Sequence, residues 1–379
     1  MSTRPMSPPL QRDFTTNRLR DRFLETTAVS AAIEFLNTFL TQYISYRRDE
    51  PSLCQAYIFN GDADGLCALH QLRLADPRAT TLITGVKRDI ALLARVSPEA
   101  GDELTVLDVS LDTNREALLG ALRIGARVRY FDHHFAGEIP HHPLLEAHID
   151  PSATLCTSLI VDRHLGGRHR AWAVVAAFGD NLHAEAWSAA AALGLRDDEI
   201  ETLRTLGECL NYNAYGRNLA DLHFHPAQLY LRMQPYADPL AFCSQSPELD
   251  ALRRASAGDL QQALALPTEN VGDAAVVVFM PEAAWSRRVA GTFANALSRR
   301  HIDRAVALLV RSGAGYQVSL RAPDRGGSAM HLLARQFESG NGRARSAGIQ
   351  FLPEPDVARL LALLRTLPAG SAPASATDH

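Results

Sequence analysis

Residues 56–65 have the sequence AYIFNGDADG. Four apolar side chains give way to an asparagine, two glycines and two aspartates, which is typical of a buried strand that runs into a turn. Residues 64–74 then have the apolar spacing of a helix. A strand, a turn and a helix in this order predict the start of a βαβ unit.

The same alternation continues beyond this stretch. We expect further strands at 81–84, 104–107 and 127–131, and helices at 90–96, 114–124, 154–165 and 171–178, with a mostly helical stretch to about residue 236. Strands that alternate with helices indicate right-handed crossovers and a parallel sheet covered on both faces.

A second unit begins near Gly272. Its expected elements are a strand at 274–280, a helix at 285–300, a hairpin of 305–311 and 316–321, a helix at 328–337, a glycine-rich turn at 339–348 and a helix at 356–367. The predicted class is therefore α/β, with a parallel-sheet N-terminal domain, a smaller α/β C-terminal domain and a cleft between them. The predicted boundaries are 1–50 (disordered leader and a helix at 28–46), 51–236, 237–271 (linker), 272–367 and 368–379 (disordered tail).

The composition excludes several classes of protein. No apolar run approaches the roughly 18 residues of a membrane span, and five scattered cysteines without a CxxC pair support neither a disulfide framework nor a zinc knuckle. We expect a soluble cytoplasmic protein without a membrane partner. A net charge of −4 argues against binding nucleic acid by bulk charge. Of the 38 basic residues, only Lys87 is a lysine, and arginine suits bidentate phosphate contacts.

Acidic residues follow the predicted strands where the strands end. Asp62 and Asp64 follow the first strand, Asp108 follows the third, and Asp132-His133-His134 follows the fourth; Asp180 ends an apolar run. The carboxyl ends of parallel strands meet at one edge of a sheet, where ligands bind. Clustered carboxylates repel each other unless a cation joins them. Carboxylates with an imidazole favour Mn²⁺ or Mg²⁺, with some tolerance for Co²⁺ or Zn²⁺.

The order of these motifs resembles that of the DHH phosphoesterase superfamily, of the RecJ-like or oligoribonuclease-like kind. The four motifs are Asp62-Ala63-Asp64-Gly65, Asp108, Asp132-His133-His134 and Asp180. The stretch 340–348, GNGRARSAG, resembles the glycine-rich motif of the DHH-associated C-terminal domain. The resemblance covers roughly residues 55–355 and makes 51–236 the phosphoesterase domain and 272–367 the substrate-binding domain.

The resemblance implies roles for individual residues. Two Mn²⁺ ions, with Mg²⁺ or Co²⁺ as substitutes, are expected on Asp62, Asp64, Asp108, His133 and Asp180, with Asp108 as the bridge. His134 is expected near the substrate phosphate, with Asp132 orienting the histidine pair and Arg321 also catalytic. The expected substrate-binding residues are Lys87, Arg88, Gly340, Gly342, Arg343 and Gly348.

Two departures from the family pattern bear on activity. Many members have a further histidine or aspartate just before the Asp-x-Asp pair, where this chain has Ile58 and Asn60; Asn60 could ligate through its amide oxygen. Arg343 stands where the family motif has a histidine. An arginine can still contact a phosphate, but it cannot shuttle protons. The first departure leaves the number of bound ions open, and the second leaves open whether the activity is altered.

Two hypotheses on function follow. The first is a Mn²⁺-dependent phosphohydrolase or phosphodiesterase that acts on a nucleotide or short oligonucleotide through a metal-activated water. The alternative is a nucleotide- or nucleic-acid-binding regulatory protein with a degenerate DHH site. A zinc hydrolase on the histidine-rich segment His133–His183 is a third, disfavoured reading, because the prolines beside His141 and His142 indicate a loop. The substrate and the oligomeric state, with a homodimer among the options, stay open.

Overall fold

The computed structural model describes residues 54–323 and 329–367. The leader, the helix expected at 28–46 and the tail at 368–379 lie outside these residues. Five strands form an entirely parallel sheet in the order β2-β1-β3-β4-β5. Their bounds are β1 Gln55–Phe59, β2 Thr81–Thr84, β3 Glu103–Leu107, β4 Arg127–Asp132 and β5 Leu145–Ile149. The predicted parallel sheet is confirmed and gains one strand, β5.

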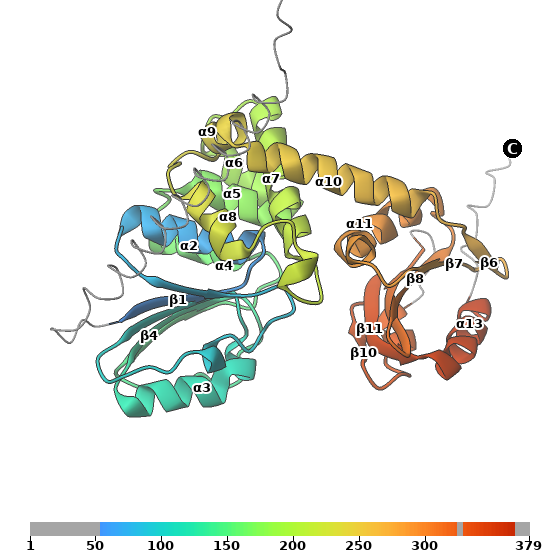
Figure 1. Cartoon of the computed structure of the whole chain (residues 1–379), viewed down its shortest axis with the longest axis horizontal. Helices are drawn as coiled ribbons and strands as arrows, with labels where there is room; N and C mark the ends of the chain where they lie inside the picture. Colours follow the sequence, from blue (N-terminus) through green and yellow to red (C-terminus); the bar gives the residue numbers. More distant parts are fainter. Residues whose placement is uncertain (1–53, 324–328, 368–379) are drawn as a thin grey trace, which may run out of the picture. The chain divides into compact units, whose positions relative to one another are not determined.

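Helices cover both faces of this sheet (Figure 1). Alternate residues of β1 point to opposite faces, because side chains alternate along a strand. Ala56 and Ile58 pack with helix α3 (Leu111–Ile124) on one face. Tyr57 and Phe59 pack on the other face with α2 (Ala63–Ala75), α4 (Thr157–His164), α5 (Arg170–Gly179) and α7 (Asp197–Ala214).

Helices α5 and α7 lie unusually close together. A Cβ on Gly207 of α7 would lie 2.1 Å from the carbonyl oxygen of Val175 in α5, so only glycine fits there. The described residues after α5 also include α6 His183–Ala191, α8 Pro226–Met233, α9 Pro239–Gln245 and α10 Pro247–Leu264. The segment predicted as a linker, 237–271, thus contains two helices, and its last residues form strand β6 (Glu269–Val271).

A second, mixed sheet has the order β10-β11-β9-β8-β7-β6. Its other strands are β7 Ala275–Met280, β8 Ala305–Ser312, β9 Gly315–Arg321, β10 Gly340–Gly342 and β11 Ser346–Pro353. Helix α11 (Ala284–Arg300) packs on one face through Val289 and Phe293, while α12 (Met330–Ala334) and α13 (Val357–Arg365) pack on the other. The second α/β unit is confirmed, and the expected glycine-rich turn at 339–348 is a strand pair, β10 with β11.

The helix expected at 90–96 is wrong. Only a single 3-10 turn, η1 (Leu93–Arg95), forms there. The Asn114 side chain of α3 accepts from the N–H of Leu93 and donates to the carbonyl oxygen of Ile90. The Ile90 carbonyl is a group that a helix would pair within itself, and Asn114 takes it while also holding the Leu93 N–H, so a tertiary contact overrides the local apolar spacing.

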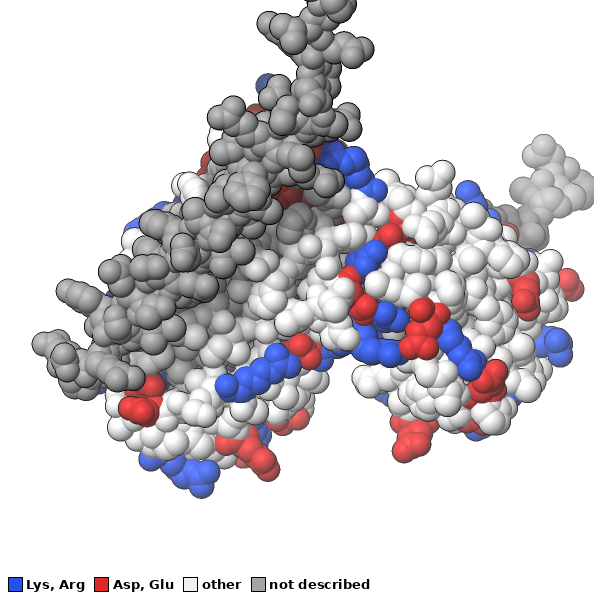
Figure 2. All heavy atoms as spheres, viewed as in Figure 1, with Lys and Arg blue, Asp and Glu red and all other residues white. Residues whose placement is uncertain are grey.

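Charged side chains do not form a single-sign surface on the face drawn in Figure 2, where acidic and basic groups lie interspersed among uncharged ones. This agrees with the small net charge of −4. Among the described residues there is no helix with both the length and the apolar character needed to span a bilayer.

The buried imidazole of His70 in α2 predicts a loss of stability in acid. Its side chain is fully buried, and its Nε2–H donates to the carbonyl oxygen of Tyr236 at 2.8 Å. Burial lowers the pKa of His70 to about 4, and the bond to Tyr236 offsets only part of that effect. The unfolded chain takes up this proton near pH 6.5, so it binds more protons than the folded chain between these values. The free energy of unfolding should therefore fall by about 2 kcal/mol between pH 7 and pH 5 on account of this ring.

Urea unfolding at the two pH values measures this effect. His70→Gln keeps a donor for Tyr236 but does not titrate in this range, so its pH dependence should be smaller by that amount. If the free energy of unfolding changes by the same amount between pH 7 and pH 5 in the wild type and in the variant, the assignment to His70 is contradicted.

Candidate metal centre

The loop after β1 places two aspartates at the start of α2. Asp62 is the N-cap of α2, and its Oδ1 accepts the N–H groups of Asp64 and Gly65, both at 3.1 Å. A Cβ on Gly65 would lie 2.1 Å from the carbonyl oxygen of Asn60, so the loop can turn back this sharply only with glycine. The DADG sequence therefore caps the helix and turns the chain, in addition to supplying carboxylates.

Asp108 follows β3 with a φ of 58°. Left-handed backbone is uncommon for residues other than glycine, although asparagine and aspartate adopt it more readily than most. The side chain is buried, and its Oδ1 accepts the hydroxyl of Thr157 at 3.2 Å. Asp180 stands at the C-terminal end of α5 and reaches the same place from the helical layer.

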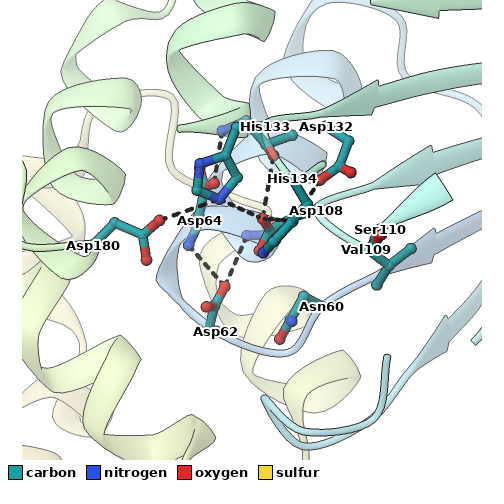
Figure 3. A network of polar contacts seen from close by, with 12 residues as sticks. Asn60, Asp62, Asp64, Asp108, Val109, Ser110, Asp132, His133, His134 and Asp180 are labelled. Carbon is teal, nitrogen blue, oxygen red and sulfur yellow. Dashed lines mark hydrogen bonds and ion pairs between the residues drawn. The ribbon is translucent and has the colours of Figure 1, made fainter. Parts of the chain in front are cut away.

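The two histidines after β4 are held by different partners. His134 Nδ1 lies 2.7 Å from Asp132 Oδ1, whereas His133 Nδ1 donates to the carbonyl oxygen of Leu155 at 2.9 Å. Among the residues that the structure describes, Asp132 thus orients His134, whereas the Leu155 carbonyl orients His133. Since a carbonyl can only accept, His133 Nδ1 carries a proton, and its Nε2 faces Asp108 Oδ1 at 3.5 Å and Asp180 Oδ2 at 3.6 Å (Figure 3).

Asp64 joins the cluster to helix α4. It is fully buried, and its two carboxylate oxygens accept the N–H groups of Thr157 and Ser158, both at 2.7 Å. Backbone donors at a helix start stabilise a carboxylate there. Sequence reasoning missed Thr157 and Ser158 as supporting residues, because nothing local marks a contact with Asp64.

Lys87 is a further residue whose position the sequence did not reveal. Its ammonium contacts Asp62 Oδ2, lies 3.3 Å from Asp180 Oδ1 and donates to Asn211 Oδ1 at 3.1 Å. The lysine expected to contact phosphate therefore lies inside the acidic cluster. Asn211, on α7, was also missed; the only signal was an unusual number of polar residues in a buried helix.

The surroundings of the cluster shift the pKa values of two of its carboxyls, Asp108 and Asp62, in opposite directions. Burial and the charges of Asp62, Asp64 and Asp180 raise the pKa of Asp108 well above its usual range. Burial also raises the pKa of Asp62 and is the largest single cause, but the charge of Lys87 together with the hydrogen bonds from Lys87 and the Gly65 N–H outweighs it, so the pKa of Asp62 is lowered. Asp108 is therefore the carboxylate that a further cation would stabilise most.

The donor set fits a divalent cation. Ligand atoms of Asp64, His133 and Asp180 lie within 4.8 Å of one another, as do those of Asp108, His133 and His134. Three or four carboxylate oxygens with one imidazole nitrogen suit Mn²⁺ or Mg²⁺ better than a metal that prefers thiolates. The Nδ1 bond of His133 supplies the outer contact that usually fixes a ligating imidazole.

Asn60 lies beside this set without completing it. Its Nδ2 donates to the carbonyl oxygen of Lys87 at 3.3 Å. Its buried Oδ1 has no hydrogen-bond partner within the described ranges 54–323 and 329–367.

The remaining predicted site residues lie elsewhere in the described chain. Arg88 is exposed next to Lys87. Arg321, on β9, donates to Asn295 Oδ1 at 2.8 Å and to the carbonyl oxygen of Leu320 at 3.0 Å. Gly342, Arg343 and Gly348 line a shallow depression of about 520 Å³ on the second sheet, and Gly340 begins β10 beside it. Contact of these residues with a substrate stays a prediction.

Comparisons with known proteins address the fold. No family model matches the sequence, and no curated protein matches it. Solved structures do match. A DHH-domain protein described as a member of the s1p family of ribosomal proteins has a TM-score of 0.55 and 14% identity, over 83% of this chain and 87% of the other. Exonuclease RecJ bound to manganese has a TM-score of 0.53 and 17% identity, over 83% and 91%.

A pGpG-specific phosphodiesterase, PggH from Vibrio cholerae, is similar to the same degree. Its TM-score is 0.51 and its identity 15%, over 83% of this chain and 98% of the other. The described chain thus has the fold of the DHH superfamily, as the four motifs predicted. At these identities, the likenesses show the fold alone.

Proposed function

We propose that this chain is a phosphoesterase that depends on a divalent cation, Mn²⁺ in the first instance, and acts on a nucleotide or short oligonucleotide. The observation that carries the proposal is the set around His133, whose Nε2 faces the buried carboxylate of Asp108 and the partly exposed carboxylate of Asp180 while its Nδ1 is held by a backbone carbonyl. An imidazole held through Nδ1 in this way aims Nε2 at negative oxygens, which is the orientation in which Nε2 can ligate a cation that those oxygens share.

Asp64, Asp108, His133 and Asp180 are the residues proposed to hold the cation. When bound, a divalent cation lowers the pKa of a coordinated water and offsets negative charge on a phosphoryl oxygen. The protein's part is to fix these ligands, and the bonds of Asp64 to α4 and of His133 to Leu155 do this.

His134 is proposed to act on the substrate itself. Its ring is 45% exposed and bonded to the buried Asp132. Burial is the largest single influence and lowers the pKa of His134, but the hydrogen bond to Asp132 and the negative charges of the nearby aspartates together outweigh it, so the pKa is raised, which favours the charged ring. A positive imidazolium beside the cluster would stabilise the charge that develops on a phosphoryl group in the transition state. Arg321, Arg88, Arg343 and the glycines of the 340–348 strand pair are proposed to hold the rest of the substrate.

The relatives support a nucleotide substrate. One neighbouring structure is named as an exonuclease and another as a pGpG-specific phosphodiesterase, so two proteins with this fold act on phosphodiester bonds between nucleotides. We expect linear dinucleotides to be better substrates than inorganic pyrophosphate, which lacks a base and sugar for the second domain to contact.

The test is a substrate panel with the purified full chain. Linear dinucleotides, nucleoside bisphosphates, cyclic dinucleotides and pyrophosphate are incubated with Mn²⁺, and released mononucleotide or phosphate is measured. Activity should disappear in EDTA and return when Mn²⁺ is added in excess. If one nucleotide binds and none is hydrolysed, a nucleotide-binding regulatory protein with a degenerate site replaces the enzyme.

A further inference from the structure

Lys87 occupies an unusual place in the acidic cluster. Its ammonium is surrounded by Asp62, Asp180 and Asn211, and it lies 5.7 Å from the centre of the Tyr215 ring. The backbone fixes the residue as well, because its N–H donates to the carbonyl oxygen of Ala214 at 3.0 Å. The carbonyl oxygen of Lys87 accepts from Asn60. The lysine is thus anchored between the loop after β1 and the end of α7.

Asp62 has no oxygen left without a partner. Its Oδ1 accepts two backbone N–H groups, and its Oδ2 contacts the lysine ammonium. Within the described ranges, two groups of side chains at the cluster have ligand atoms within 4.8 Å of one another, and both include His133. Asp62 belongs to neither group. The carboxylate of Asp62, which follows Ile58 and Asn60 closely along the chain, therefore has all its oxygens occupied by the ammonium and by backbone N–H groups.

We infer that the ammonium of Lys87 stands where a second divalent cation would otherwise bind, so that the site holds a single cation on Asp64, Asp108, His133 and Asp180. The inference deepens the proposed function and rests on it. It assigns Asp62 to Lys87 instead of to a metal, and it makes Lys87 a positioning residue that fixes the number of ions.

The chemistry of lysine suits this role. An ammonium is a compact point charge with three donors, which matches the three oxygens of Asp62, Asp180 and Asn211 around it, whereas a guanidinium presents its donors in a planar fork. The chain uses arginine for every other basic residue, and its one lysine is here. Asn60 fits the same reading, since a neutral amide in place of a further charged ligand leaves Asp62 with the lysine as its counter-charge.

The experiment counts bound ions directly. Isothermal titration of the metal-free full chain with Mn²⁺ gives the stoichiometry, and electron paramagnetic resonance separates an isolated Mn²⁺ ion, with six lines, from a coupled pair. We expect one isolated ion per chain in the wild type. Lys87→Met removes the charge and frees Asp62, so a second ion should bind and the spectrum should become that of a coupled pair.

Two further variants keep the result interpretable. Arg88→Met removes a positive charge from the next, exposed residue and should leave the stoichiometry at one. Lys87→Arg keeps a charge and should also bind one ion, and circular dichroism checks that each variant is folded. Should Lys87→Met fail to fold, the wild-type count and the Lys87→Arg spectrum still decide.

Each outcome has a separate meaning. Two ions in the wild type would overturn the inference and leave the proposed function intact. One ion in both the wild type and folded Lys87→Met would show that Lys87 does not exclude the second ion, which also overturns it. No bound ion in the wild type would remove the proposed function itself.

Discussion

Replacement of Asp108 by asparagine is expected to lower kcat/KM on the best nucleotide substrate by about 10³-fold, equivalent to about 4 kcal/mol of transition-state stabilisation. The residue is buried, and its Oδ1 lies 3.5 Å from His133 Nε2 at the centre of the proposed ligand set. Asparagine keeps the shape and tolerates the φ of 58°, so the loss should come from the missing charge and not from strain. Steady-state kinetics in saturating Mn²⁺ measures the effect.

In the absence of metal, the free energy of unfolding of Asp108→Asn should be at least as large as that of the wild type. Removing one of several repelling carboxylates relieves the charge conflict that raises the pKa of Asp108. Asp112→Asn, in the exposed first turn of α3, is the matched control and should keep full activity. An Asp108→Asn protein that retains more than a tenth of the wild-type activity would place the chemistry elsewhere.

Replacement of Trp172 by alanine is expected to lower the free energy of unfolding by about 3–5 kcal/mol. The side chain is fully buried in α5, and its indole N–H donates to the carbonyl oxygen of Ala237 at 3.0 Å. Its ring meets that of His70 edge-on at 4.5 Å between centroids. Alanine would leave a large cavity and an unpaired carbonyl. Urea unfolding at pH 7 measures the loss.

The same substitution at Trp187 is the control. That side chain, on α6, is 40% exposed, so Trp187→Ala should cost no more than about 1 kcal/mol. Because Asp180 stands at the end of α5, a loosened α5 should also weaken Mn²⁺ binding by the Trp172 variant. Equal unfolding free energies for the two variants would contradict the burial argument.

The sequence predicts the edge of the sheet where the candidate site lies. Buried strands that end in aspartate are visible in the chain as apolar runs followed by Asp62, Asp108 and Asp132, and parallel strands bring such ends together. Strand β5 was missed because its residues are only partly buried and include Glu146 and His148, which break the apolar run. The prolines beside His141 and His142, just before this strand, indicated a loop, whereas the backbone completes the sheet.

The parts that the sequence did not reveal depend on contacts between distant segments. The Lys87 ammonium meets Asn211, and Asp64 meets the start of α4, in pairs far apart along the chain. The composition singled out Lys87 as the one lysine, but composition gives no position in space. The failed helix at 90–96 has the same cause, since the Asn114 side chain competes for its backbone groups.

The bond between Asp64 and α4 also bears on when the cation can bind. The residues it joins are 93 and 94 positions apart in the chain, so the carboxylate is held in place only after this long loop has closed. An incompletely folded chain presents the aspartates separately and has no preformed pocket for an ion. Cations would therefore bind the native state and not the nascent chain. By mass action they would stabilise the folded protein relative to its folding intermediates.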